Sequence, residues 1–99
     1  MNHYLIPFFD GNDKQNLAML KIDLGITTTA YDTRLTALLN TAAGRIAEEG
    51  ITLDASRADD NALLVMYAGW LWRKRDTMEG MPRMLRYALN NRLFAEKMA

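Results

Sequence analysis

Residues able to do acid–base or metal chemistry are few and scattered in this chain. His3 is the single histidine, and cysteine is absent, so neither a disulfide framework nor a thiolate metal site can form. Two acidic pairs, Glu48–Glu49 and Asp59–Asp60, are adjacent in sequence. Adjacent helical positions do not face each other, so neither pair converges on one site. We expect His3 to be incidental, and the acidic pairs to be solvated or, for Asp59–Asp60, placed favourably at a helix start.

Motifs of known chemistry are also missing from the sequence. The fragment DGNDK at residues 10–14 is similar to the start of a calcium loop, but the twelfth position of such a loop holds Lys21, not glutamate. No phosphate-binding glycine loop, nucleophile elbow or zinc spacing occurs. The sequence therefore favours a protein that is not an enzyme and that uses no cofactor or metal.

Charge is distributed unevenly along this neutral chain. Residues 1–72 contain five Lys/Arg and nine Asp/Glu, whereas residues 73–99 contain seven Lys/Arg and three Asp/Glu. This difference is either a chance property of two solvated faces or a means of contact with another copy or an acidic partner. The run Arg73, Lys74 and Arg75 can complement a helix dipole, touch a nucleic-acid backbone or dock onto an acidic protein. Overall neutrality disfavours stand-alone DNA binding.

Two tryptophans stand just before this cationic run. We expect Trp70 to be core, and Trp72 to be either core or part of a binding surface, where tryptophan is enriched. Met66 is predicted to be core. The methionines that flank the following turn are candidates to face a partner, and they are Met78, Met81 and Met84.

Periodicity and capping signals predict four helices that position these residues. The first runs over residues 13–24, with Asn12 and Gln15 as a capping-box-like start and Gly25 as its stop. The second extends from the region of Thr29 and Asp32 to Gly50. Its core stripe has offsets 0, 3, 4, 7, 8 and 11, and it consists of Leu35, Leu38, Leu39, Ala42, Ala43 and Ile46.

The third helix begins near Ser56 or Asp59 and ends near Arg75. Residues 62–72 are apolar on every side, so we expect this helix to be the hydrophobic centre, with one side able to face another subunit. Its predicted buried residues are Leu64, Tyr67, Ala68, Trp70 and Leu71.

The fourth helix begins at Pro82. Its predicted apolar stripe contains Leu85, Ala88, Leu89 and Leu93, and is extended sideways by Met84, Tyr87, Phe94 and Met98. Its predicted polar stripe contains Arg83, Arg86, Asn90 and Lys97.

The sequence thus predicts a single all-α domain over residues 13–99, preceded by an extended arm at residues 1–12. The longest apolar run has eleven residues, whereas a membrane span needs about 20. The N-terminus lacks a basic region and a small-residue cleavage site, which argues against a signal peptide. These features predict a soluble cytoplasmic protein.

The order and character of the helices resemble a known family. The segment LKIDLGITTTAYDTRLTALLNTAAGRI precedes an apolar helix, a charged stop and a proline-started basic helix, YAGWLWRKRDTMEGMPRMLRYALNNRL. This pattern, with an L-x-I-D…D-x-x-L signature at Leu20–Asp23 and Asp32–Leu35, is similar to the small head–tail connector (adaptor) proteins of tailed bacteriophages and prophages. The resemblance covers residues 14–95.

The resemblance implies a structural assembly protein. Copies would form a ring under the portal protein, extend the channel that carries the packaged DNA, and receive a tail-side stopper or completion protein. The protein would be made in the host bacterial cytoplasm and would end at the virion head–tail junction.

Within that role, we expect the contact residues to be Arg73, Lys74, Arg75, Arg83, Arg86 and Trp72. Reversal of Arg83 and Arg86 to Glu is expected to leave the fold intact. The alternative function is a small DNA-binding regulator that reads DNA with the basic C-terminal helix.

Overall fold

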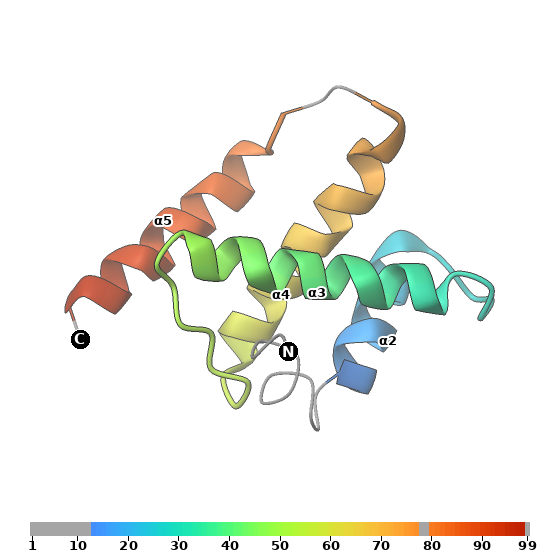
Figure 1. Cartoon of the computed structure of the whole chain (residues 1–99), viewed down its shortest axis with the longest axis horizontal. Coiled ribbons are helices and arrows are strands. Elements are labelled where there is room, and N and C mark those ends of the chain that lie inside the picture. The colour runs from blue at the N-terminus through green and yellow to red at the C-terminus, as the bar shows by residue number, and fades with distance from the viewer. Residues whose placement is uncertain (1–12, 78–79, 99) are drawn as a thin grey trace.

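The computed structural model describes residues 13–77 and 80–98, and within these ranges it contains helices and no strand (Figure 1). The helices are α2 (Asp13–Leu24), α3 (Asp32–Glu48), α4 (Ala58–Arg73) and α5 (Arg83–Met98), with a short 3-10 turn η1 (Lys74–Asp76) after α4. The prediction of an all-α, four-helix domain is confirmed. The predicted arm, with its candidate cap Asn12, lies outside the described residues.

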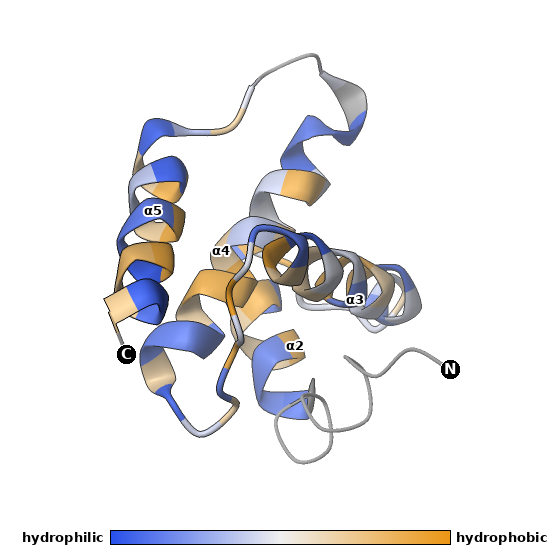
Figure 2. Ribbon diagram, turned by 60° about the vertical axis from the view of Figure 1, so that its left-hand side comes forward, coloured by the Kyte–Doolittle hydropathy of each residue, from blue (hydrophilic) through white to orange (hydrophobic). Residues whose placement is uncertain are grey.

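Helix α4 is the centre of the domain. It packs against α2 and α3 on one side and against α5 on the other (Figure 2). The five residues predicted to be buried on this helix are all buried, and Leu64 and Ala68 are fully inaccessible. Leu20 of α2, the inner stripe of α3, and Leu85 with Leu89 of α5 close the core around it. A helix that is apolar on most sides is thus covered by the inner faces of three others.

Two glycines terminate helices as predicted. Gly25 has φ of 72° after α2, and Gly50 has φ of 97° after α3, a conformation in which other residues are strained. The start of α3 differs from the prediction. Its N-cap is Tyr31, and no side chain caps the helix; the Thr29 carbonyl accepts the Asp32 N–H at 3.1 Å.

An ion pair within the segment of the L-x-I-D…D-x-x-L signature links α2 and α3. Lys21 Nζ lies 2.7 Å from Asp32 Oδ1, so the charges at the end of α2 and the start of α3 hold the intervening loop closed. Asn16, which is buried on α2, donates to Asn61 Oδ1 on α4 at 3.2 Å. Polar contacts therefore fix α2 against both of its neighbours.

One expectation about the core is wrong. Met66 is 42% exposed, because it lies on the strip of α4 that neither α2 nor α3 covers. The four side chains that extend the apolar stripe of α5 sideways are exposed, and they are Met84, Tyr87, Phe94 and Met98. The reason is that α5 approaches α4 through a narrow stripe centred on Leu85 and Leu89, which leaves its sideways apolar positions in solvent.

Candidate interaction surfaces

The end of α4 carries a layered cluster of aromatic and cationic side chains. The Arg75 guanidinium lies 3.8 Å from the centroid of the Trp72 ring, and Tyr31 meets the same ring edge-on at 5.5 Å between centroids. Arg75 also donates to the Trp72 carbonyl. Because stacking and hydrogen bonding hold Arg75 in place, Trp72 is half-buried under its own neighbours and is not an open anchor.

Trp70 is core, as predicted, and its contacts tie α4 to the following turn. Its Nε1–H donates to the Gly80 carbonyl at 3.2 Å, and Lys74 Nζ lies 4.5 Å from its ring centroid. Lys74 is therefore half-buried against an aromatic face. Of the three consecutive cations, Lys74 and Arg75 are both engaged within the chain.

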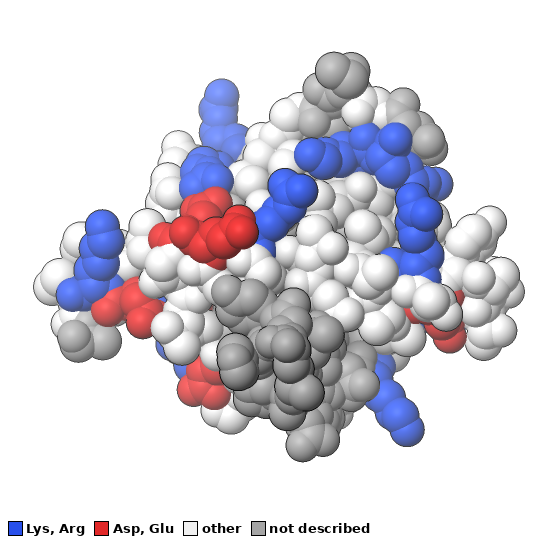
Figure 3. Space-filling view, in the orientation of Figure 1, with Lys and Arg blue, Asp and Glu red and all other residues white. Residues whose placement is uncertain are grey.

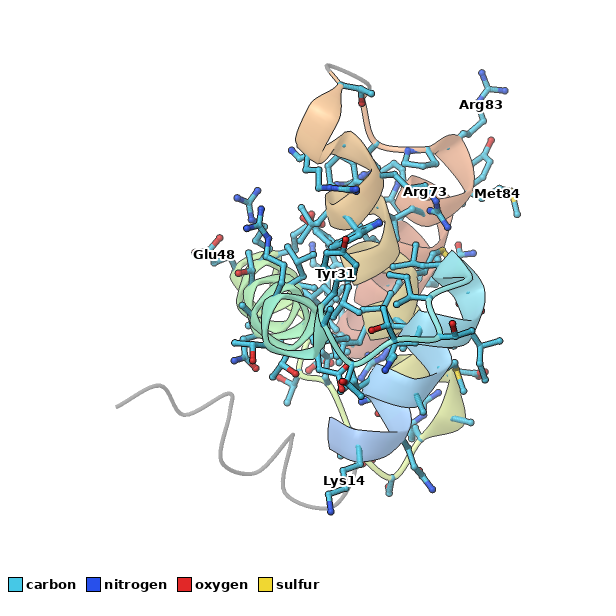
Figure 4. The ribbon with its side chains drawn as sticks, turned by 90° about the vertical axis from the view of Figure 1, so that its right-hand side faces the viewer. Lys14, Tyr31, Glu48, Arg73, Arg83 and Met84 are labelled. Atoms are coloured by element: carbon cyan, nitrogen blue, oxygen red, sulfur yellow. The ribbon has the colours of Figure 1, made fainter. Side chains whose placement is uncertain are left out.

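Arg73 is the outward member of this cationic run. It is exposed, and it makes no ion pair with another described residue. Its guanidinium lies over Gly69, so a Cβ atom added at Gly69 would sit 3.6 Å from Arg73 Nη1. Figure 4 shows Arg73, Arg83 and Met84 on one side of the molecule and Glu48 on the other. In the view of Figure 3, Lys and Arg side chains gather over the end of α4 and the adjoining part of α3.

Arg86 is bound within the chain. Its Nη1 donates to Glu49 Oε1 at 3.0 Å and its Nη2 to Glu49 Oε2 at 2.9 Å, a two-pronged pair that joins α5 to the end of α3. The carboxylate raises the pKa of Arg86 above its ordinary value, chiefly through these hydrogen bonds. The expectation that Arg86 can be reversed without harm is revised, because a glutamate there would oppose Glu49. The pair with Arg86 also explains why acidic Glu49 stands at the C-terminus of α3, where the helix dipole disfavours a negative charge.

A buried ion pair joins the inner face of α5 to the start of α4. Asp60 is 1% exposed, and its oxygens accept from Arg92 Nε at 2.8 Å and Nη2 at 3.2 Å. The Asp54 N–H donates to Asp60 Oδ2 at 2.8 Å, which satisfies the carboxylate further. Asp59 and Asp60 lie in the first turn of α4, as predicted, but the expected solvation is wrong for Asp60, because this side chain faces the core.

Arg92 extends this pair into a network. It donates to the Thr52 carbonyl at 2.8 Å and to Glu96 Oε1 at 3.0 Å. The hydrogen bond from the Thr52 N–H, followed in importance by the one from Arg92, holds the pKa of Glu96 below its ordinary value. Sequence reasoning missed Arg92. A signal existed, since positions 85, 89, 92 and 96 follow a helical repeat, so Arg92 and Glu96 share the buried face with Leu85 and Leu89.

The outer side of α5 is an unpartnered apolar face. Met84 is 72% exposed and Phe94 is 66% exposed, and Tyr87 and Met98 are similarly open. We call these four residues with Asn91 the α5 outer face. A shallow groove of about 360 Å³ adjoins this face, and its walls include Ala62 and Met66 of α4 and Ala88 and Ala95 of α5. Contiguous exposed apolar surface of this kind is typical of a site for another macromolecule.

Neither a metal centre nor a membrane span is found in the described part of the chain. No group of three or more potential metal ligands occurs among those residues. No helix there is long and apolar enough to cross a bilayer. A scan against models of protein families, a search of curated proteins and a search of solved structures each gave no match.

Proposed function

We propose that this chain is a structural head–tail connector, a ring subunit that docks under the portal of a tailed bacteriophage. The ring would extend the DNA channel and present a platform to the next tail-side protein. The sequence pattern over residues 14–95 supports this role through its resemblance to the connector family. The virion head–tail junction would be its final location.

The observation that carries the proposal is the α5 outer face. Four large apolar side chains on one 16-residue helix are left in solvent, although the core beneath that helix is well covered. Exposed apolar area of this extent favours association with another macromolecule. A subunit whose packing is completed only in an assembly has this property.

Arg83 supports the same role. It occupies the first position of α5, where the helix dipole disfavours a cation, and no acidic residue stands in that first turn. Arg83 is exposed and forms no ion pair with a described residue. A charge that does nothing for its own helix is well placed to meet a partner. Arg73, on the same side in Figure 4, is a second exposed cation without an ion pair to a described residue.

The alternative role, a DNA-binding regulator that reads through α5, fits the side-chain environments less well. Arg86 is bound to Glu49 and Arg92 is bound to Asp60, so neither is available to phosphates or bases without breaking a pair. The most exposed face of α5 is apolar, whereas DNA-binding helices present polar and basic side chains. A gel-shift assay tests this role directly: a regulator binds a specific duplex far more tightly than random DNA.

Electron microscopy of particles made without this gene tests the connector role. In the phage or prophage that encodes the chain, we expect filled or leaking heads beside free tails. An in-frame deletion restored from a plasmid is the control, since restoration excludes effects on neighbouring genes. Normal virions from the deletion strain would overturn the proposal.

A further inference from the structure

Exposed large hydrophobic side chains are concentrated on two helices of the described chain. Four lie on the α5 outer face, and two, Met19 and Ile22, lie on the solvent side of α2, where Ile22 is 78% exposed. We call Gln15, Ala18, Met19 and Ile22 the α2 outer face. The two other exposed large side chains have local roles, since Tyr31 packs on Trp72 and Met66 lines the groove beside α5.

The spacing on α5 suits packing along another helix. Its outer positions 84, 87, 91, 94 and 98 alternate steps of three and four residues, the pattern of a helix–helix seam. Asn91 is the single polar member of that series. On one edge the seam is bordered by the small residues Ala88 and Ala95, which permit close approach. The geometry therefore favours a helix as the occupant of this face.

The charges at the borders of the two faces are complementary. The other edge of the α5 face carries the exposed cations Arg83 and Lys97, and the α2 face is bordered by the exposed Asp23. None of the three forms an ion pair with a described residue. Each face thus has an apolar centre, and the Asp23 edge of α2 is opposite in sign to the Arg83 and Lys97 edge of α5, while the other edge of the α2 face carries the exposed Lys14.

The two faces belong to different sides of the molecule. In Figure 1, α5 and α2 lie on opposite sides of the axis of α4, and no extensive contact joins them within the chain. An interaction between them must therefore involve two copies. Such a head-to-tail contact leaves one face of each copy free for the next, which is the condition for a ring or a filament.

We propose, building on the connector role proposed above, that the α5 outer face docks on the α2 outer face of a second copy of this chain. The two helices run parallel. In a parallel pair, opposite edges of the two helices meet, so the Asp23 edge of α2 faces the Arg83 and Lys97 edge of α5. In an antiparallel pair, Asp23 would face Ala88 and Ala95 instead.

Self-pairing of two α5 helices is less favourable on the same grounds. An antiparallel α5 pair would bring the two cationic edges together, and a parallel pair would leave them opposite alanines. Neither arrangement gives Arg83 or Lys97 a counter-charge on the partner helix, whereas α2 supplies one. Charge complementarity therefore selects α2 as the occupant.

Disulfide trapping tests this contact cleanly, because the native chain has no cysteine. Full-length Ile22→Cys and Phe94→Cys proteins are mixed at concentrations approaching the millimolar range and oxidised briefly. We expect the mixed 22–94 product to form faster than either same-site product, and faster than the product of Ile22→Cys with Met84→Cys. Thr41→Cys, at an exposed site on α3, is the matched control and should give no enrichment with Phe94→Cys.

A charge swap sharpens the test. Lys97→Glu on the Phe94→Cys protein should slow mixed trapping by about two- to fivefold, the effect of one surface ion pair. Asp23→Lys on the Ile22→Cys protein should then restore the rate. Circular dichroism of each variant confirms that the helices are retained.

Three outcomes would contradict the proposed α2–α5 contact or its arrangement. A predominant 94–94 product, which indicates α5 self-pairing, or no trapping above the Thr41→Cys control would overturn the contact itself, and a faster product with Met84→Cys would overturn its parallel arrangement. These results are distinguishable from failure of the connector role. If rings form under the portal but are joined through other faces, only the α2–α5 contact is rejected. If 22–94 trapping is specific but the deletion strain makes normal virions, only the connector function is rejected.

Discussion

Helices α4 and α5 are neighbours of equal length with opposite relations to solvent. Both have 16 residues, yet nine residues of α4 are buried against two of α5. α4 is held by apolar burial on most sides, whereas α5 is attached by a thin apolar stripe and by ion pairs to Asp60 and Glu49. The charge pairs fix the position of α5 while its apolar outer face stays free. Apolar content all round identifies α4 as the core helix, whereas on α5 the inward apolar stripe is joined by polar anchors.

Loss of the buried Asp60–Arg92 ion pair, which joins α4 to α5, should have the largest effect on stability. Arg92→Met leaves the Asp60 carboxylate buried without its counter-charge, which typically costs about 3–5 kcal/mol of unfolding free energy. Urea denaturation followed by circular dichroism measures this loss. The double variant Asp60→Asn with Arg92→Met removes both charges and should recover part of the stability. A single-variant loss below about 1 kcal/mol would show that α5 is held by its apolar stripe alone.

Truncation within α4 should have the next largest effect. Leu64 is fully buried, so Leu64→Ala loses burial and leaves a cavity, with an expected cost of about 2–4 kcal/mol. Met66→Ala, two positions away on the exposed strip, is the matched control and should cost about 0.5 kcal/mol or less. Equal losses at the two positions would contradict the central placement of α4.

Much of this arrangement can be predicted from the sequence, because helical periodicity, caps and glycine stops are local signals. The bounds of α2, the inner stripe of α3 and the buried residues of α4 follow from them. The partners of Arg86 and Arg92 could not be predicted in this way, since Glu49 and Asp60 lie 37 and 32 residues earlier in the chain. The inward stripe of α5 at Leu85 and Leu89 followed from periodicity, whereas the ion pairs that anchor the helix did not.

The two arginines of the α5 polar stripe should respond differently to charge reversal. Arg86→Glu replaces a two-pronged pair with two facing carboxylates, and because the site is partly exposed we expect a loss of about 1 kcal/mol. Arg83→Glu puts an anion at the start of α5, where the dipole favours it, so stability should be unchanged or rise by about 0.5 kcal/mol. Thermal melts of both variants check this, and a destabilised Arg83→Glu protein would place Arg83 in an internal contact.

The smallest expected effect is on the acid side of the pH–stability curve. The Thr52 N–H and Arg92 lower the pKa of Glu96 below 4.5, and hydrogen bonds from Ser56 lower that of Asp54 below 3.8. Groups whose pKa is lower in the folded state stabilise the protein above their unfolded-state pKa, and this contribution is lost as the pH falls through the folded-state value. Stability should therefore decline as the pH drops below about 4.5.

Glu96→Gln isolates the part of this decline that belongs to α5. The variant should be less stable than the native chain at neutral pH, and the difference should shrink as the pH falls below about 4.5, because the native carboxyl then takes up its proton. Urea denaturation at several pH values measures the difference. Lys97→Gln, a change on the same helix that removes no carboxyl, is the control for altered net charge. Native and Glu96→Gln curves that remain parallel down to about pH 3 would show that Glu96 does not help hold α5 to the loop at Thr52.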